Sequence, residues 1–229
     1  MSELFSIQLQ NRQQQGGDGV WLDLPTTTEQ VQAALRQIGI SSDNPQGLFI
    51  SGYFAEEEKR FAIPYNMVLA SNVDELNFLA SRLETLSAGE RAELNAALQA
   101  PQSELSSIGR IIDFPENVDY YVHLPDVRGP AQLGDYYLNR SGMVDMPEEW
   151  KGGIDTAQFG RYVAQQEQGA FTQYGYLVKS GDEWQKVHEG QPVPEEYRVL
   201  SFPASEILRD AANIPPPVQP ETEPQKVIP

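Results

Sequence analysis

Two histidines and 33 carboxylates are the side chains of this sequence that could take part in acid–base or metal chemistry. His123 and His188 fall in different parts of the chain and lack the His-x-x-x-His spacing of a metal site, so we interpret both as structural or surface residues. The chain has no cysteine, which excludes disulfides and thiolate-bound metals and is typical of a reducing compartment. The sequence therefore predicts neither a metal centre nor a cofactor.

The carboxylates are too numerous for any one pair to be singled out as a general acid and base. The sequence also lacks the Gly-x-Ser-x-Gly turn of a serine hydrolase and the glycine-rich loop of a nucleotide site. We therefore predict a binding protein and not an enzyme. An enzyme would need a pocket in which carboxylates of perturbed pKa converge.

The net charge of −17 at pH 7 limits the kinds of partner that the chain can bind. Affinity for nucleic acid comes from clustered Lys and Arg, so direct binding to nucleic acid is disfavoured, whereas the basic DNA-binding clefts of other proteins would attract this chain. The first hundred residues hold 13 acidic and 6 basic side chains, and the next fifty hold 9 and 3. This even density favours a long acidic face over an acidic tail. The alternative is that the charge serves only solubility.

No apolar run approaches the roughly 18–20 residues that a membrane span needs. The first residues also lack the basic and apolar regions of a secretory signal. We therefore expect no membrane association and a cytoplasmic location.

The carboxylates must be positioned by the elements around them, and residues 1–68 predict a small α/β domain. Alternating apolar and polar residues predict strands over 4–10 and 19–24, and a third strand is expected over 48–53. A helix should follow the second strand, beginning at a capping box of Thr27 with Gln30. Residues 61–64 predict a further short strand.

Residues 69–117 predict a helical domain of three helices joined by short links. Asn72 with Glu75, and Ser87 with Glu90, are candidate capping boxes for the first two helices, and Ser103 is the expected start of the third. Apolar residues recur on one face of each predicted helix, which is typical of a core and not of a cofactor site.

Residues 118–178 predict a second α/β domain. We expect a strand over 118–123, a helix that begins at Pro130, a helix capped by Asp155 and a closing strand over 171–178.

An acidic turn precedes the Asp155 helix in this domain. We expect it to rest on a small aromatic core made of Trp150, Phe159, Tyr162 and Phe171.

Beyond the second α/β domain, residues 179–213 predict a small extension with strands over 184–188 and 197–202 and a helix over 204–212. Between 214 and 229, six of the 16 residues are proline, which predicts a disordered tail. The expected fold class is α+β, with three small domains (α/β, helical, α/β) followed by the extension and the Pro-rich tail.

Five segments of the chain, in this order and spacing, resemble ArdA-type antirestriction proteins of conjugative plasmids and transposons. The resemblance covers residues of about 17–177 and rests on GVWLDLP (19–25), VDELNFLASRLETLSAGERAELNAAL (73–98), DYYLNRSGMVDMPEEW (135–150), GGIDTAQFGR (152–161) and GAFTQYGY (169–176).

The resemblance implies an elongated, curved, acidic molecule of three small domains, usually a homodimer, that imitates bent B-form DNA. Such proteins occupy the DNA-binding groove of type I restriction–modification enzymes, in the complex of methyltransferase and specificity subunits, and so protect incoming mobile DNA. On this basis we expect the phosphate-mimicking surface to comprise Glu84, Glu90, Glu93, Glu104, Asp113, Glu116, Asp119, Asp126, Asp135, Asp145, Glu148, Glu149 and Asp155.

Two features of the chain leave alternatives open. Residues 179–229 extend past the resemblance, and basic residues dilute the acidic surface; these are Lys59, Arg60, Arg91, Arg110, Arg140 and Arg161. The target could therefore be another DNA-binding defence enzyme. The chain could also be an acidic interaction or adaptor module of a mobile element, with its charge serving only solubility.

Overall fold

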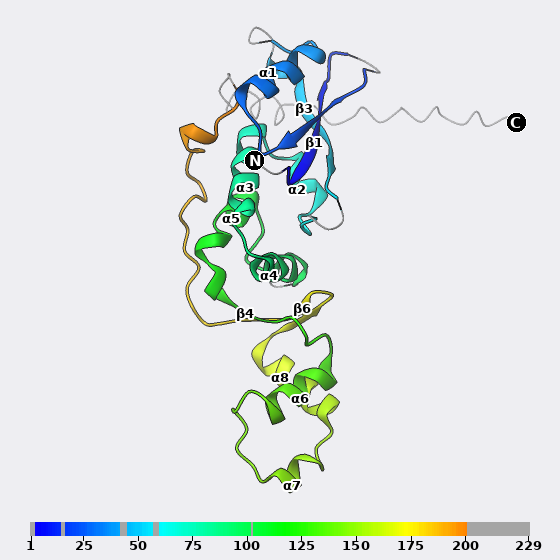
Figure 1. Cartoon of the computed structure of the whole chain (residues 1–229), viewed down its shortest axis with the longest axis vertical. Coiled ribbons are helices and arrows are strands. Elements are labelled where there is room, and N and C mark those ends of the chain that lie inside the picture. Colours follow the sequence, from blue (N-terminus) through cyan, green and yellow to red (C-terminus); the bar gives the residue numbers. More distant parts are fainter. Residues whose placement is uncertain (1–2, 15–16, 42–44, 57–59, 102, 201–229) are drawn as a thin grey trace, which may run out of the picture.

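The computed structural model describes residues 3–14, 17–41, 45–56, 60–101 and 103–200. These residues form an elongated molecule (Figure 1). One three-stranded antiparallel sheet lies near one end, a group of helices follows, and a second such sheet lies beyond them, with a further group of helices at the far end. The combination of helices with small antiparallel sheets confirms the predicted α+β class.

The first sheet has the order β2-β1-β3, with β1 (Phe5–Asn11) between β2 (Val20–Leu24) and β3 (Leu48–Phe54). Alternate residues of β1 are buried, as the predicted period of two requires. Helix α1 (Thr28–Gln37) follows β2 and begins at the predicted capping box of Thr27 and Gln30. A 3-10 turn, Pro45–Gly47, leads into β3.

The strand predicted over 61–64 is wrong. These residues belong to neither a helix nor a strand, although Phe61 and Ile63 are buried and so keep the alternation that suggested one. Helix α2 (Tyr65–Leu69) follows directly and was not predicted, because five residues are too few to establish a helical period.

The next helices are α3 (Val73–Glu84), α4 (Ala88–Gln99) and α5 (Ile108–Ile112). The backbone N–H of Glu75 donates to the Asn72 side chain at the start of α3, and the complete predicted capping box is present at Ser87 in α4.

The predicted start of α5 at Ser103 is wrong, because Ser107 caps this helix instead. The Ser103 hydroxyl accepts a hydrogen bond from the backbone N–H of Leu105 at 3.1 Å. Ser103 thus forms a local turn, which is the alternative role of a cap-forming residue.

The buried apolar side chains form one large core that runs from the first sheet through α3, α4 and α5 without a break at the predicted 68/69 boundary. This core continues into Tyr120, Tyr121 and Leu177 of the following unit. A second, small core belongs to the far end and contains Val127, Leu133, Ala164 and Tyr176.

The second sheet has the order β4-β6-β5, with β6 (Gly175–Lys179) between β4 (Tyr121–Leu124) and β5 (Ala170–Thr172). The single strand predicted over 171–178 is therefore a hairpin. Gly175 makes the turn possible, because its φ of +132° is rarely adopted by residues with a Cβ. The predicted strand over 118–123 is shorter than expected, because Val118–Tyr120 forms a 3-10 turn.

Helices α6 (Pro130–Asn139) and α8 (Thr156–Glu167) cross at two glycines. A Cβ atom at Gly134 would lie 1.9 Å from the carbonyl oxygen of Thr156, and one at Gly160 would lie 1.8 Å from that of Pro130. The two backbones can approach so closely only because neither glycine has a side chain.

The aromatic core predicted beneath the acidic turn is wrong in part. The turn contains the short helix α7 (Glu148–Lys151), and Trp150 in it is 68% exposed. Tyr162 on α8 is 60% exposed, whereas Phe159 and Phe171 are half-buried. We call the segment 141–155, with α7 at its centre, the tip (Figure 1).

After β6, residues 180–200 run back along the helices towards the first sheet, and we call this segment the strap (Figure 1). The strands predicted within it are wrong, because the only regular element among these residues is a 3-10 turn, Glu195–Tyr197. The predicted helix over 204–212 and the tail over 214–229 lie outside the described residues. In the part of the chain that the structure covers, every helix is too short or too polar to cross a membrane.

Candidate partner-binding surface

The 13 carboxylates predicted to face a partner have three kinds of environment. One, Asp113, is fully buried. Five are half-buried, namely Glu84, Glu90, Glu93, Glu104 and Asp135. Seven are exposed, namely Glu116, Asp119, Asp126, Asp145, Glu148, Glu149 and Asp155.

Three exposed carboxylates, Asp145, Glu148 and Glu149, lie together on the tip. Glu148 forms an ion pair with Lys151 one turn along α7, at 3.0 Å. Asp155 follows and accepts a hydrogen bond from the backbone N–H of Gln158 at 2.9 Å, so it caps α8 while remaining exposed. The tip therefore presents negative charge at the far end of the molecule.

A second exposed group lies where the helices meet the strap. Glu116 and Asp119 line an open hollow of about 440 Å³ together with Asp182 and Glu183 of the strap. Glu116 also pairs with Arg82 of α3, so part of its charge is neutralised within the molecule. Among the described residues, no cluster of His, Asp or Glu is arranged to hold a metal ion.

The structure removes Asp113 from the candidate surface. Its side chain is fully buried, and its two oxygens accept hydrogen bonds from the backbone N–H groups of His188 and Glu189, at 2.6 and 3.2 Å. A carboxylate in this position stabilises the strap and cannot contact a partner.

Glu104 is also engaged within the molecule. Its carboxylate binds Lys179 Nζ at 2.7 Å and Arg110 Nη1 at 2.5 Å, and it accepts a hydrogen bond from the Tyr120 hydroxyl. The hydrogen bond from Lys179 is the main cause of its lowered pKa. Arg110 in turn binds Glu189 of the strap at 3.0 Å. This network joins α5, β6 and the strap.

Glu93 on α4 is the least suited of the half-buried residues to replace a phosphate. Burial, followed by the nearby charges of Glu90 and Asp119, raises its pKa to about 8. At pH 7 its side chain is therefore mostly protonated and neutral.

The remaining half-buried carboxylates differ in their engagement. Glu90 completes the capping box of Ser87 at the start of α4, and its hydrogen bonds with Ser87 lower its pKa. Asp135 binds Arg140 at 2.9 Å and accepts a hydrogen bond from Asn139. Glu84 is half-buried at the end of α3.

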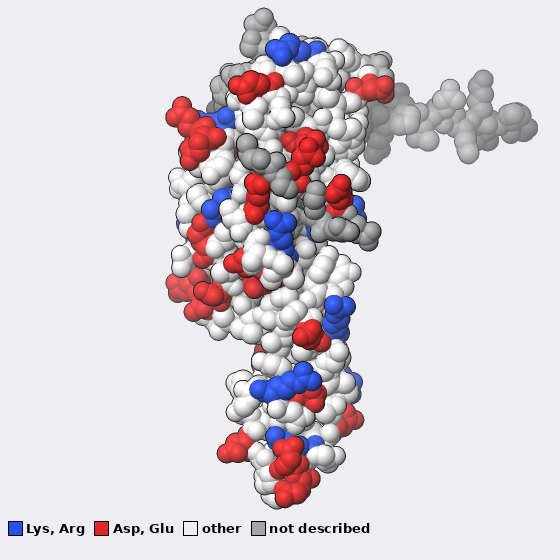
Figure 2. Space-filling model, in the orientation of Figure 1, with Lys and Arg blue, Asp and Glu red and all other residues white. Residues whose placement is uncertain are grey.

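The charged side chains form separate patches on the face drawn in Figure 2, and Lys and Arg lie between them. Acidic patches follow the edge where α5 and the strap run, and another covers the tip around α7. The acidic surface is thus long but interrupted.

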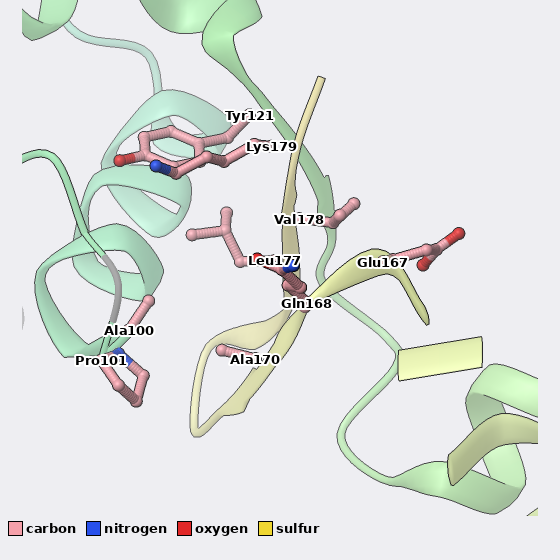
Figure 3. Close-up of a pocket in the computed structure, with 10 residues that line it drawn as sticks. Ala100, Pro101, Tyr121, Glu167, Gln168, Ala170, Leu177, Val178 and Lys179 are labelled. Atoms are coloured by element: carbon pink, nitrogen blue, oxygen red, sulfur yellow. The ribbon is translucent and has the colours of Figure 1, made fainter. Parts of the chain in front are cut away.

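A pocket of about 250 Å³ lies between the end of α4 and the second sheet (Figure 3). Lys179 and Tyr121 lie near each other on one side of it, and Glu167 points away from them. The Glu167 carboxylate accepts hydrogen bonds from the hydroxyls of Tyr137 and Tyr176, while Lys179 is bound to Glu104. The ionisable groups of this pocket therefore do not point to a common centre.

Both histidines make structural contacts, as predicted. His123 Nε2 lies 2.9 Å from the carbonyl oxygen of Tyr174, in the turn between β5 and β6. The ring of His188 packs edge-on against Phe78 at 5.0 Å.

Sequence reasoning missed four exposed carboxylates of the strap, namely Asp182, Glu183, Glu195 and Glu196. They lie beyond the segments that carry the family resemblance. It also left Asp23 out, although the alternation of β2 could have identified it, since Asp23 is exposed opposite the buried Leu22 and Leu24.

The comparison with known families agrees with these observations. The model of the family described as antirestriction protein (ArdA) matches residues 17–178, so it begins after β1, covers β2, β3, the helices that follow and nearly all of the second sheet, and ends before the strap. No curated protein matches the chain. The match spans well over half of the sequence, and the chain therefore belongs to the ArdA family of antirestriction proteins.

Proposed function

We propose that this protein inhibits a type I restriction–modification enzyme by occupying its DNA-binding groove, with exposed carboxylates standing where DNA phosphates would lie. Membership of the ArdA family supports an antirestriction role and an interaction with restriction enzymes. The observation that bears most directly on the mechanism is the distribution of exposed carboxylates along an elongated molecule, from the edge of the helices to the tip.

The mechanism needs binding and no turnover. The DNA groove of the enzyme must present Lys and Arg to hold phosphates. Exposed carboxylates such as Asp119, Asp145 and Glu149 can meet those cations in the same groove. Complementary charge speeds the encounter and helps to fix the register of the complex. Incoming DNA is then excluded by competition.

The direct test is binding of the full chain to a purified type I methyltransferase core that contains its specificity subunit. We expect the affinity to fall as salt rises, because exposed charges are screened. A duplex that contains the recognition sequence should displace the protein. Binding that is indifferent to salt, or a ternary complex with DNA, would contradict the proposal.

The interruptions of the acidic surface favour a second candidate function. Lys and Arg between the patches suit an adaptor that uses only one patch, or an inhibitor with a shorter binding site on another DNA-binding defence enzyme. The adaptor predicts that DNA does not compete. An inhibitor of another enzyme predicts competition on that enzyme and none on the type I core.

The resemblance also leads us to propose a homodimer. Sedimentation analysis of the full chain should give about twice the monomer mass of 25.6 kDa at micromolar concentration. A monomer mass throughout that range would contradict this part of the proposal.

A further inference from the structure

The strap lacks the hydrogen bonds that a helix or a sheet would provide. Apart from the 3-10 turn Glu195–Tyr197, its described residues form no regular element. Backbone N–H and C=O groups near a protein core nevertheless need partners. The source of those partners shows how the strap is held.

Four buried polar side chains of the helical region supply them, namely Asp74, Asn77, Asp113 and Asn117. Each of these side chains forms hydrogen bonds with backbone atoms of the strap and not with side chains of the strap. Asn117 and Gln185 form a reciprocal pair, in which Asn117 donates to the Gln185 carbonyl at 3.0 Å and accepts from its N–H at 2.7 Å.

The two aspartates each accept two successive backbone N–H groups. Asp113 receives those of His188 and Glu189, and one oxygen of Asp74 receives those of Val199 and Leu200, at 2.7 and 2.8 Å. A buried carboxylate is costly unless it is hydrogen-bonded, so the strap provides what these two side chains need.

Asn77 connects the strap to the first sheet. Its side chain donates to the carbonyl of Tyr197 at 3.0 Å and accepts from the backbone N–H of Thr26 at 2.7 Å, two residues after the end of β2. At the other end of the strap, the N–H of Ser180 donates to the Tyr120 carbonyl, just before β4. The strap therefore extends from one sheet to the junction with the other.

Aromatic contacts hold the strap between these points. Trp184 packs edge-on against Tyr120 at 5.1 Å, and Tyr197 lies 4.6 Å from Phe78. Val199 and Leu200 are buried in the large core. The strap thus has both polar and apolar anchors along its length.

We propose that the helical region contains a groove for extended backbone, that residues 180–200 are its occupant, and that the bound strap fixes the two sheets of the antirestriction region in one relative arrangement. The family match ends at residue 178, so this element lies outside the matched region. The claim that the fixed arrangement favours target binding rests on the proposed function, whereas the groove and its occupant do not.

The sharpest variant is Glu189→Pro, because Glu189 occupies a turn in which proline is tolerated. The N–H of Gln191 donates to the His188 carbonyl, and Gly190 has a φ of +79°, which places Glu189 at the second position of a type II turn. Proline is favoured there, and it removes the N–H that binds Asp113 together with the side chain that binds Arg110. Glu189→Ala is the matched control, since it also loses the side chain that binds Arg110 but keeps the N–H.

The first measurement is amide hydrogen exchange in the intact full chain. In the wild type we expect the amides of His188, Val199 and Leu200 to exchange at least a hundredfold more slowly than in an unstructured peptide. Glu189→Pro should accelerate exchange at His188 about tenfold relative to Glu189→Ala. The groove proposal would be overturned if these wild-type amides exchanged at the rates of an unstructured peptide. It would also be overturned if His188 exchanged equally fast in the two variants.

The second measurement is binding of both variants to the type I methyltransferase core, with circular dichroism to confirm equal helical content. We expect Glu189→Pro to bind about fivefold more weakly than Glu189→Ala. Suppose that the exchange experiment shows an opened strap in Glu189→Pro, yet the two variants bind the core equally well. This result would overturn the proposal that the strap fixes the relative arrangement of the two sheets. If the wild type fails to bind at all, the proposed function fails, and the exchange experiment still decides the groove.

Discussion

At the scale of single residues, carboxylates of one chemical type have different roles here because their surroundings differ. Glu149 is exposed on the tip, Asp155 caps a helix, Asp113 is buried beneath the strap, and burial holds Glu93 largely neutral at pH 7. Only the exposed ones can contribute charge to a partner. The count of 33 acidic residues therefore overstates the charged surface.

Replacing Glu93 by glutamine should stabilise the protein at neutral and alkaline pH. The folded chain keeps a proton on Glu93 up to a pKa of about 8, whereas the unfolded chain releases it near the ordinary value of 4.5. Between these pH values deprotonation favours unfolding, so wild-type stability falls as pH rises. Glutamine removes this penalty, and we expect a gain of about 1 kcal/mol at pH 8 after allowance for partial exposure.

Urea unfolding at pH 5, 6, 7 and 8 measures this effect. The difference between Glu93→Gln and wild type should be smallest at pH 5 and should grow towards pH 8. Glu149→Gln, on the exposed tip, is the control. A difference that is constant with pH would show that Glu93 ionises normally.

At the scale of secondary structure, local signals could be predicted from the sequence and distant ones could not. The caps at Thr27 and Ser87 depend on residues three positions apart, and both were predicted. The strap was predicted as strands, although none forms among its described residues. Its true partners, such as Asp113 for His188, lie about 75 residues away in the sequence. Burial of Asp113 could not be foreseen for the same reason.

The crossing of α6 and α8 predicts that alanine at Gly134 is destabilising. The added methyl group would lie 1.9 Å from the Thr156 carbonyl oxygen, so the helices must separate. We expect a loss of about 1–3 kcal/mol in the free energy of unfolding, measured by urea denaturation.

Gly89→Ala is the matched control for this crossing. Gly89 lies in the first turn of α4 and has open space around its Cβ position. Alanine should raise stability there by about 0.4–1 kcal/mol, because it restricts the unfolded chain. If both substitutions changed the free energy of unfolding in the same direction and by the same amount, the close approach of α6 and α8 would be contradicted.

At the scale of the whole molecule, the question is whether the acidic patches act together. The tip and the edge beside the strap lie in different parts of an elongated molecule (Figures 1 and 2). A mimic of a long duplex must use both, because phosphates run along its full length. An adaptor needs only one.

Two matched triple variants separate these possibilities, and each lowers the net negative charge by three. The tip variant is Asp145→Asn/Glu148→Gln/Glu149→Gln, and the edge variant is Asp119→Asn/Asp182→Asn/Glu183→Gln. All six side chains are exposed, so both proteins should keep wild-type unfolding curves.

If each exposed ion pair with the partner contributes about 0.5 kcal/mol, each variant should bind the type I methyltransferase core roughly tenfold more weakly. Because the sites are far apart, the combined variant should lose about a hundredfold, with a weaker salt dependence. Loss in one variant alone would instead identify a single-patch adaptor.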